Sequence, residues 1–240
     1  MDAATGRRPA RGGAPRVDKR RALLDGALEV FAQDGYARAS IDAIARRAGV
    51  STRTIYNQFG DKATLFEAVI VDSARRTADA QIAIVQRCLG KIANIEDDLI
   101  EFARLWAQPS PESALHFALV RQVIADARHI PPAALQAWQE AGPLRVQKEI
   151  AAHLRRIADA GHLAIDDADL AAVHLVQLVA GDATRRSFYG AIPLPTEEVY
   201  RVADAGVRAF LYGYGVRRPR KSQASRAVGA SRAPRAARRT

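Results

Sequence analysis

Residues 52–58 concentrate polar side chains that can exchange hydrogen bonds with the edges of nucleic-acid bases. Arginine pairs with guanine, asparagine or glutamine pairs with adenine, and the methyl group of threonine contacts thymine. The segment contains no carboxylate that would repel a phosphate backbone. We therefore predict base contacts from Thr52, Arg53, Thr54 and Asn57.

Three further side chains flank this segment and suit phosphate oxygens rather than bases. Tyr56 offers a phenol and Lys62 offers an ammonium group. Ser40 stands where we expect the N-terminus of the preceding helix, a position that favours an anion because backbone N–H groups are free there. Such contacts position a protein on a duplex without specifying sequence.

The elements that must hold these residues are two short helices joined by a tight turn. Apolar residues recur at helical spacing within 41–48, and Gly49 breaks that helix. Val50 then supplies an apolar plug, while Ile55 and Phe59 point back at the apolar stripe of the first helix. The pattern predicts helix-turn-helix geometry with the second helix as the reader.

Capping residues predict four helices in the first part of the chain. Gly35 closes the first helix, Ser40 caps the second, Ser51 caps the third, and Gly60-Asp61 starts the fourth.

Helices joined by a glycine turn also occur in proteins that never touch DNA. Charge favours DNA binding here, because residues 38–59 hold four arginines and a single acid, Asp42. A basic arm also lies immediately upstream.

The formal net charge of +10 is unevenly distributed. Residues 1–21 carry seven basic and two acidic side chains, and residues 217–240 carry nine basic and no acidic ones, which leaves the body between them at −4. Both ends lack large apolar residues, so we expect a disordered basic arm at 1–16 and a disordered basic tail at 216–240. Solubilising the protein and holding nucleic acid nonspecifically are both open roles.

Other chemistry finds little support. The sequence has no phosphate-binding loop, dinucleotide fingerprint, nucleophile elbow or zinc-protease motif. The five histidines lack close metal-ligand spacing, and Cys88 is the single cysteine. We therefore predict no enzyme activity, no metal and no cofactor.

Neither a signal peptide nor a membrane span is predicted. The N-terminus lacks an apolar run, and the longest uncharged apolar stretch, 170–181, is too short to cross a bilayer. We expect a cytoplasmic protein without a membrane partner.

The rest of the chain has helical spacing throughout and no alternating strand pattern. Prolines and glycines divide it into predicted helices near 62–89, 94–107, 112–127, 132–141, 143–160, 167–187 and 196–212. A small N-terminal helical unit is thus fused by one helix to a larger helical body.

Residues 20–70 carry a dense set of spaced motifs, namely Phe31 at the end of an entry helix, a Gly35-Tyr36 corner, Ile44-Ala45, Ala48-Gly49-Val50-Ser51, Tyr56, Phe59, Lys62 and Leu65-Phe66. This pattern resembles the N-terminal domain of the TetR family of bacterial transcriptional regulators. Asn57-Gln58 departs from it, since aromatic residues or histidine are frequent there, and the departure bears on operator preference. A looser resemblance to the regulatory domain of AefR-like members runs through LVRQVIADARHIPPAALQAWQEAGPLRVQKEIAAHL and LVQLVAGDATRRSFYG.

The resemblance implies an all-α fold, in which an N-terminal helix-turn-helix DNA-binding domain is fused to a larger helical regulatory and dimerisation domain. The first would cover 17–77, with its motif at 40–59, and the second 78–215. It also implies a homodimer whose last two helices form a four-helix bundle across the two-fold axis. Such a dimer binds a near-palindromic double-stranded DNA operator with half-sites about 34–36 Å apart.

The central helices would enclose a pocket for a small-molecule effector that the sequence does not name. Candidate pocket residues are large or polar side chains on otherwise apolar faces: Phe102, Trp106, His116, Trp138, His174 and Gln177. Candidate dimer-interface residues are Ala171, Leu175, Leu178, Ala203, Gly206 and Phe210. Spacing alone does not separate either set from ordinary intramolecular core.

The expected function is that of a ligand-responsive dimeric repressor, released from its operator by an effector. An architectural, sequence-independent DNA binder that works through its tails is the alternative. It predicts that deleting 1–18 and 217–240 abolishes binding, whereas a regulator keeps a specific complex with a shallower salt dependence.

Overall fold

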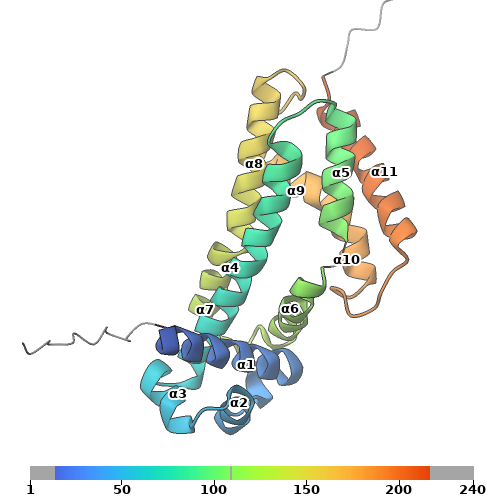
Figure 1. The fold of residues 1–240 in the computed structure, drawn as a ribbon. Coiled ribbons are helices and arrows are strands. Elements are labelled where there is room, and N and C mark those ends of the chain that lie inside the picture. The colour runs from blue at the N-terminus through green and yellow to red at the C-terminus, as the bar shows by residue number, and fades with distance from the viewer. Residues whose placement is uncertain (1–13, 109, 217–240) are drawn as a thin grey trace, which may run out of the picture.

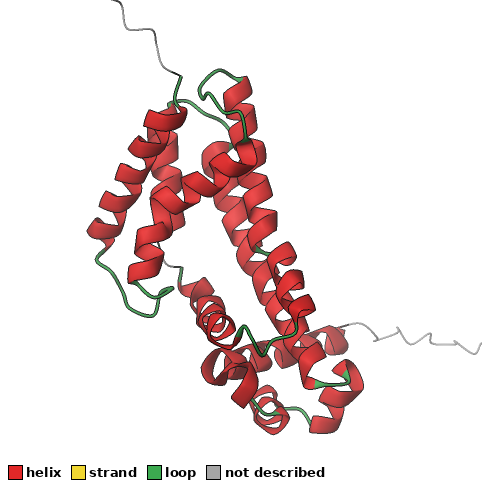
Figure 2. Cartoon of the chain, turned by 180° about the vertical axis from the view of Figure 1, so that it is seen from behind, coloured by secondary structure: helices red, strands yellow, loops and turns green. Residues whose placement is uncertain are grey.

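The computed structural model describes residues 14–108 and 110–216, and every regular element in these ranges is helical (Figure 2). The N-terminal unit comprises α1 (Ala14–Arg38), α2 (Ile41–Ala48), α3 (Thr52–Phe59) and the start of α4 (Lys62–Leu89). There follow α5 (Ile95–Ala107), the short 3-10 helix η1 (Pro111–Ser113), α6 (Ala114–Asp126), α7 (Pro132–Ala141), α8 (Pro143–Asp159), α9 (Ala168–Val176), the π-helical turn η2 (Gln177–Gly181), α10 (Asp182–Arg186) and α11 (Thr196–Tyr214). The all-α fold expected from the sequence is confirmed.

Side-chain caps start the helices of the N-terminal unit at the expected residues. The Ala43 N–H donates to Ser40 Oγ at 3.1 Å, and the Thr64 N–H donates to Asp61 Oδ1 at 2.7 Å. Gly49 closes α2 in the left-handed conformation, with φ 66°. These bonds satisfy backbone groups that a helix end leaves free, so the boundaries are fixed by short-range chemistry.

The long helix α4 joins two separate apolar cores. Its first half contributes Phe66 and Ile70 to a core with α1, α2 and α3. Its second half contributes Val85 and Leu89 to a core with α5, α8, α9 and α11. Figure 1 shows that α1 crosses α4 near its N-terminal end. Helix α8 runs alongside α4, and α5 lies beside α11.

The N-terminal core is not made by residues 17–77 alone. Leu119 and Val123 of α6 and Ala134 of α7 lie in the same core as Phe31 and Phe66. Helix α6 packs more extensively against α1 than any other helix does (Figure 1). Segments from the second half of the chain therefore complete the core of the first.

The expected basic arm overlaps the first helix. Because α1 begins at Ala14, residues 14–16 are helical, contrary to the expectation of disorder through residue 16. The remainder of the arm, and the tail at 217–240, lie outside the described residues.

Helix α9, the π-helical turn η2 and helix α10 follow one another without a break, so that residues 168–186 form one helical path with a wider turn in its middle. Gly206 of α11 crosses this path so closely that a Cβ at that position would lie 2.3 Å from the Leu178 carbonyl oxygen. A glycine is therefore required for α11 to lie against the π-helical turn.

Within the described ranges, no helix is both long enough and apolar enough to cross a membrane.

Candidate nucleic-acid interface

Helix α3 has one face buried in the N-terminal core and the opposite face exposed to solvent. Ile55 and Phe59 are buried in the N-terminal core, whereas Arg53, Tyr56 and Asn57 are exposed. Since positions 53, 56 and 57 share one face of a helix, the structure brings these three side chains together on the outer surface.

The two threonines of α3 are placed less openly. Thr52 and Thr54 are both half-buried. The Thr54 hydroxyl lies 2.9 Å from Ser51 Oγ, which also accepts the Thr54 N–H at 3.1 Å. Thr54 thus takes part in the cap that starts the helix, and its methyl group is the part left for a base.

Helix α2 adjoins α3 (Figure 1), and the residue that caps its N-terminus, Ser40, is exposed. Ser40 Oγ accepts the Ala43 N–H, so its own hydroxyl hydrogen is left to donate to an anion. On α2, Arg46 is exposed, while Arg47 forms an ion pair with Glu29 of α1. The surface around α3 is therefore basic and bears hydrogen-bond donors, as phosphate binding requires.

Lys62 turns toward the end of α1. Its ammonium group donates to the Ala37 carbonyl oxygen at 3.2 Å and lies 4.9 Å from the centre of the Tyr36 ring. Burial lowers the pKa of Lys62, and the nearby Asp126 carboxylate opposes that shift. An ammonium group has three hydrogens, so this bond leaves donors for a phosphate.

The sequence comparisons agree with this geometry. Residues 23–69 match the family described as bacterial regulatory proteins, tetR family. Residues 109–216 match the C-terminal domain described as that of an AefR-like transcriptional repressor. The chain belongs to the TetR family. The family resemblance inferred from the motifs, and its AefR-like extension, are confirmed.

Curated relatives of this TetR-family chain include regulators with different signs of action. The transcriptional repressor AcnR of Corynebacterium efficiens is 35% identical over 79 residues, covering 33% of this chain and 38% of AcnR. The transcriptional activator FasR of Mycolicibacterium smegmatis is 40% identical over 75 residues, covering 31% and 32%. The regulator BetI of Escherichia coli is 32% identical over 120 residues, covering 50% and 51%. The chain thus spans about a third to a half of the length of these curated relatives.

Solved structures match the TetR-family chain over most of its length. A TetR-family transcriptional regulator from Mesorhizobium loti is 28% identical with a TM-score of 0.76, covering 85% of this chain and 100% of that one. The flavonoid-responsive regulator FrrA is also 28% identical, with a TM-score of 0.61 and coverage of 84% and 100%. The arrangement of both halves is therefore that of the family.

The six residues proposed for an effector pocket do not line one cavity. Phe102 is fully buried in the core that α5 forms with α4, α8, α9 and α11, and the centre of its ring lies 5.4 Å from that of Trp106. Trp138 packs against the N-terminal core instead. His174 and Gln177 are exposed on the outer face, where His174 Nδ1 lies 2.7 Å from the Tyr214 hydroxyl. The residue types suggested a shared pocket. In the folded chain, however, these side chains lie in two different cores and on the surface.

His116 is the pocket candidate with the most unusual surroundings. It is buried at the crossing of α6 and α4, and its Nδ1 lies 2.9 Å from Ser73 Oγ. Burial lowers the pKa of His116 to about 4, and the positive charge of Arg76 adds to the effect. The imidazole is therefore neutral at physiological pH and acts as a hydrogen-bonding group.

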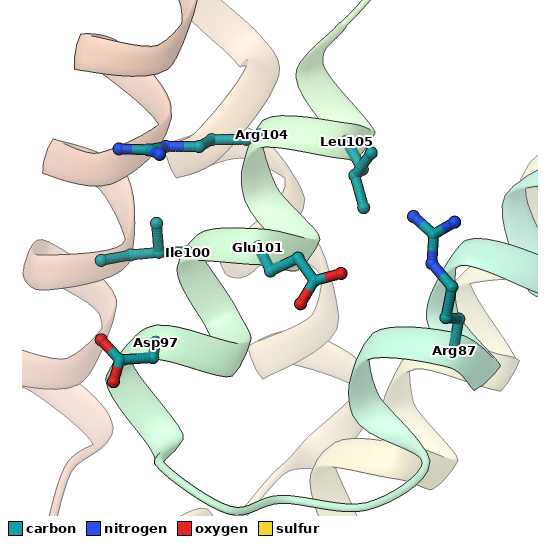
Figure 3. A pocket seen from close by; sticks show the side chains of 6 residues that line it. All are labelled: Arg87, Asp97, Ile100, Glu101, Arg104 and Leu105. Atoms are coloured by element: carbon teal, nitrogen blue, oxygen red, sulfur yellow. The ribbon is translucent and has the colours of Figure 1, made fainter.

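An open hollow of about 510 Å³ lies between α4 and α5 (Figure 3). In this view, Glu101 and Leu105 face Arg87 of α4, whereas Arg104 extends toward α11 and forms a two-bonded ion pair with Asp204, at 2.8 and 2.7 Å. The lining includes none of the six pocket candidates, because Phe102 and Trp106 occupy the inward face of the same helix. This charged, solvent-facing hollow does not have the apolar character of a small-molecule pocket.

Five of the six residues proposed for the dimer interface are core residues of this chain. The buried five are Ala171, Leu175, Ala203, Gly206 and Phe210, while Leu178 is 41% exposed. Ala171, Leu175, Ala203 and Phe210 belong to the core that α9 and α11 share within this chain, and Gly206 lies against the backbone of Leu178.

The opposite faces of α9 and α11 carry exposed apolar groups, and the sequence analysis had included Leu178 among them but not Leu170, Val173 or Tyr212. On α9 these are Leu170 and Val173, which continue to Leu178, and on α11 Tyr212 is 80% exposed. The signal was present in the sequence, since seven of the nine residues of α9 are apolar, Asp169 and His174 being the exceptions, whereas a helix at the surface of a monomer has a broader polar side.

Proposed function

We propose that this TetR-family protein is a dimeric, ligand-responsive repressor that acts on chromosomal DNA in the cytoplasm. The observation that carries the proposal is the exposed, carboxylate-free face of α3, held outward by buried Ile55 and Phe59. Arg53 and Asn57 have the bidentate chemistry that distinguishes guanine and adenine in the major groove. Their exposure on a rigid helix supports a reading role.

Phosphate contacts would flank the base contacts. Tyr56 is 52% exposed beside Arg53 and Asn57, and Ser40 lies at the N-terminus of α2. Lys62, at the start of α4, would donate to a phosphate with the ammonium hydrogens that are not bonded to the Ala37 carbonyl oxygen. Together these groups would fix the register of α3 in the groove, while Thr52 and Thr54 contribute methyl contacts at its start.

The exposed apolar face of α9 and α11 supports a dimer. Leu170, Val173 and Leu178 lie on one helical path, and Tyr212 lies on α11. Large exposed apolar groups gathered on two adjacent helices indicate an association surface, and a second copy joined by a two-fold axis covers such a surface with itself. Two reading helices then face two half-sites, so the operator is near-palindromic.

The effector would bind the regulatory half and act by shifting the population of two dimer arrangements. It can do so only by binding one arrangement more tightly than the other. In the released arrangement the two copies of α3 no longer match the half-sites.

Selection of bound sequences from a random DNA library, with the full chain as bait, tests the proposal. We expect enrichment of a two-fold symmetric sequence with half-sites about one helical turn apart. The variant Arg53→Ala should enrich a sequence that is relaxed at one base position of each half-site, whereas Arg156→Ala, which removes an exposed arginine of α8, should enrich the wild-type sequence. Equal recovery of all sequences by the wild-type chain would contradict a sequence-specific regulator and favour the architectural alternative.

A further inference from the structure

The last turn of α1 is broken at a corner that the regulatory half touches directly. Gly35 has φ 78° and ψ 171°, so the helix does not continue regularly to Arg38. Two residues further on, both backbone polar groups of Ala37 are hydrogen-bonded to side chains of other helices. Its N–H donates to Asp126 Oδ2 of α6 at 3.3 Å, and its carbonyl oxygen accepts from Lys62 Nζ at 3.2 Å.

The ends of two side chains of α6 lie directly against this corner. A Cβ on Gly35 would lie 2.8 Å from Asp126 Oδ2 and 2.9 Å from Gln122 Oε1. The positive φ favours glycine at this position, and the two distances show how closely the α6 side chains approach the corner. Gln122 Nε2 also reaches the Gln33 carbonyl oxygen at 3.5 Å. The C-terminal part of α6 is thus fitted to the end of α1.

The same helix is tied to the other end of the regulatory half. Arg121, next to Gln122, donates from Nη1 to the Tyr189 carbonyl oxygen at 2.7 Å. Tyr189 belongs to the turn that leads from α10 into α11, and α11 carries part of the exposed apolar face. Helix α6 therefore has polar contacts both to the proposed dimer side and to the DNA-reading unit.

We propose that Asp126 is a positioning residue for operator binding, which sets the orientation of the reading unit relative to the regulatory half. This inference rests on the proposed dimeric function. The corner that Asp126 holds leads within three residues to Ser40, the cap of α2, and so to α2 and α3. Packing of Tyr36 against Phe66, at 4.7 Å between ring centroids, fixes the corner against α4. Asp126 fixes it against α6.

The role has a specific consequence in a dimer. The distance and angle between two copies of α3 depend on how each reading unit sits on its own regulatory half. Asp126 thereby determines which half-site spacing the dimer accepts, although it touches no DNA. Loss of its bond leaves each reading unit intact but less firmly oriented.

A spacer series tests this proposal with the full chain and the selected operator. One base pair is inserted into or removed from the centre of the operator, and affinities are measured by fluorescence anisotropy for wild type, Asp126→Ala, Asp126→Asn and Asp126→Glu. The wild type should lose about tenfold or more in affinity on either altered spacer, because the second half-site is rotated and shifted. Asp126→Ala should lose only about threefold, with weaker binding to the original operator.

The two conservative variants separate position from charge. Asparagine keeps an oxygen at the right distance for the Ala37 N–H, so Asp126→Asn should retain the wild-type spacing preference. Glutamate keeps the charge and displaces the oxygen, so Asp126→Glu should resemble Asp126→Ala. Glu variants of helical positions retain helix propensity, which keeps the test usable if the alanine variant is unstable. Asp159→Ala, an exposed carboxylate at the end of α8, is the matched control.

A wild-type spacing preference in Asp126→Ala, or in Asp126→Glu when the alanine variant does not fold, would overturn the proposal. Equal flattening in the asparagine and alanine variants would also overturn it, because the hydrogen bond would then be irrelevant. A wild-type chain that shows no spacing preference at all would instead contradict the dimeric function on which the inference rests.

Discussion

The two cores of the molecule differ in what they bury. The N-terminal core is built from apolar side chains, such as Phe31, Ile44 and Phe66. All buried polar side chains within the described ranges occur from residue 73 onward, namely Ser73, Thr77, His116, His153 and Ser187. Burying a polar group costs free energy unless it is hydrogen-bonded, so the packing from the middle of α4 onward depends in part on bonds that protonation or a ligand can change. The reading unit, by contrast, is an apolar block.

Acid should act on the regulatory side of this comparison, and it carries the largest expected effect. Folded His116 has a pKa of about 4, against an ordinary value of 6.5. As pH falls below 6.5, His116 is protonated in the unfolded chain but stays neutral in the folded chain, so the free energy of unfolding decreases until about pH 4. Over that window the loss reaches about 3 kcal/mol. Denaturant titrations at several pH values measure it.

The variant His116→Gln should show a flatter dependence of unfolding free energy on pH between 6.5 and 4, at the cost of lower stability at neutral pH. His162→Gln, which removes an exposed histidine, should keep the wild-type profile. A wild-type slope in His116→Gln would show that another group controls the acid response.

Each core also contains one close helix crossing at a glycine, and the two should differ in cost. A Cβ on Gly206 would meet the Leu178 carbonyl oxygen at 2.3 Å, and one on Gly26 would meet the Ala48 backbone at 2.9 Å. Gly206→Ala should therefore destabilise by about 2–3 kcal/mol and Gly26→Ala by about 1 kcal/mol. Thermal unfolding of the two variants gives the comparison, and a larger loss for Gly26→Ala would reverse it.

The parts of the fold that were predictable are those with local causes. Ser40, Ser51 and Asp61 each bond a backbone N–H three residues ahead, so the helix starts in the N-terminal unit followed from short spacing alone. The predicted helix at 62–89 coincides with α4, and the last helix continues only two residues beyond its predicted end, to Tyr214.

Helix faces were not predictable to the same degree, because they depend on distant neighbours. Phe59 was correctly directed inward, since α3 has a clear polar side. By contrast, seven of the nine residues of α9 are apolar, so the sequence does not indicate which of its apolar side chains are buried. Packing against α8 and α11 decides that Leu175 is buried while Leu178, in the following π-helical turn, is exposed. The hydrogen bond from the Ala37 N–H to Asp126 joins residues 89 positions apart in the sequence. No sequence periodicity operates at such a separation.

Reading of bases by the apolar block can be tested at a single exposed residue. Arg53→Ala should weaken operator binding by about 2 kcal/mol and relax specificity at one base position of each half-site, if the arginine contacts a guanine. Quantitative gel shifts on single-base operator variants measure both effects. Unchanged affinity for the selected operator would remove Arg53 from the reading set, and Arg156→Ala again serves as the control.

Lys62 should give the smallest effect, and a different kind of effect from either Arg53 or Asp126. If its free ammonium hydrogens contact a phosphate, Lys62→Ala weakens binding to all sequences about equally, by about 1 kcal/mol, and lowers the salt dependence by about one counterion. The packing of Tyr36 against Phe66 still holds the corner in this variant, so the spacing preference of the dimer should remain. Anisotropy titrations over a range of salt, on the operator and on unrelated DNA, distinguish the roles. An unchanged salt slope with a changed spacing preference would mean that Lys62 acts on the corner alone, beside Asp126, and that the phosphate contact does not exist.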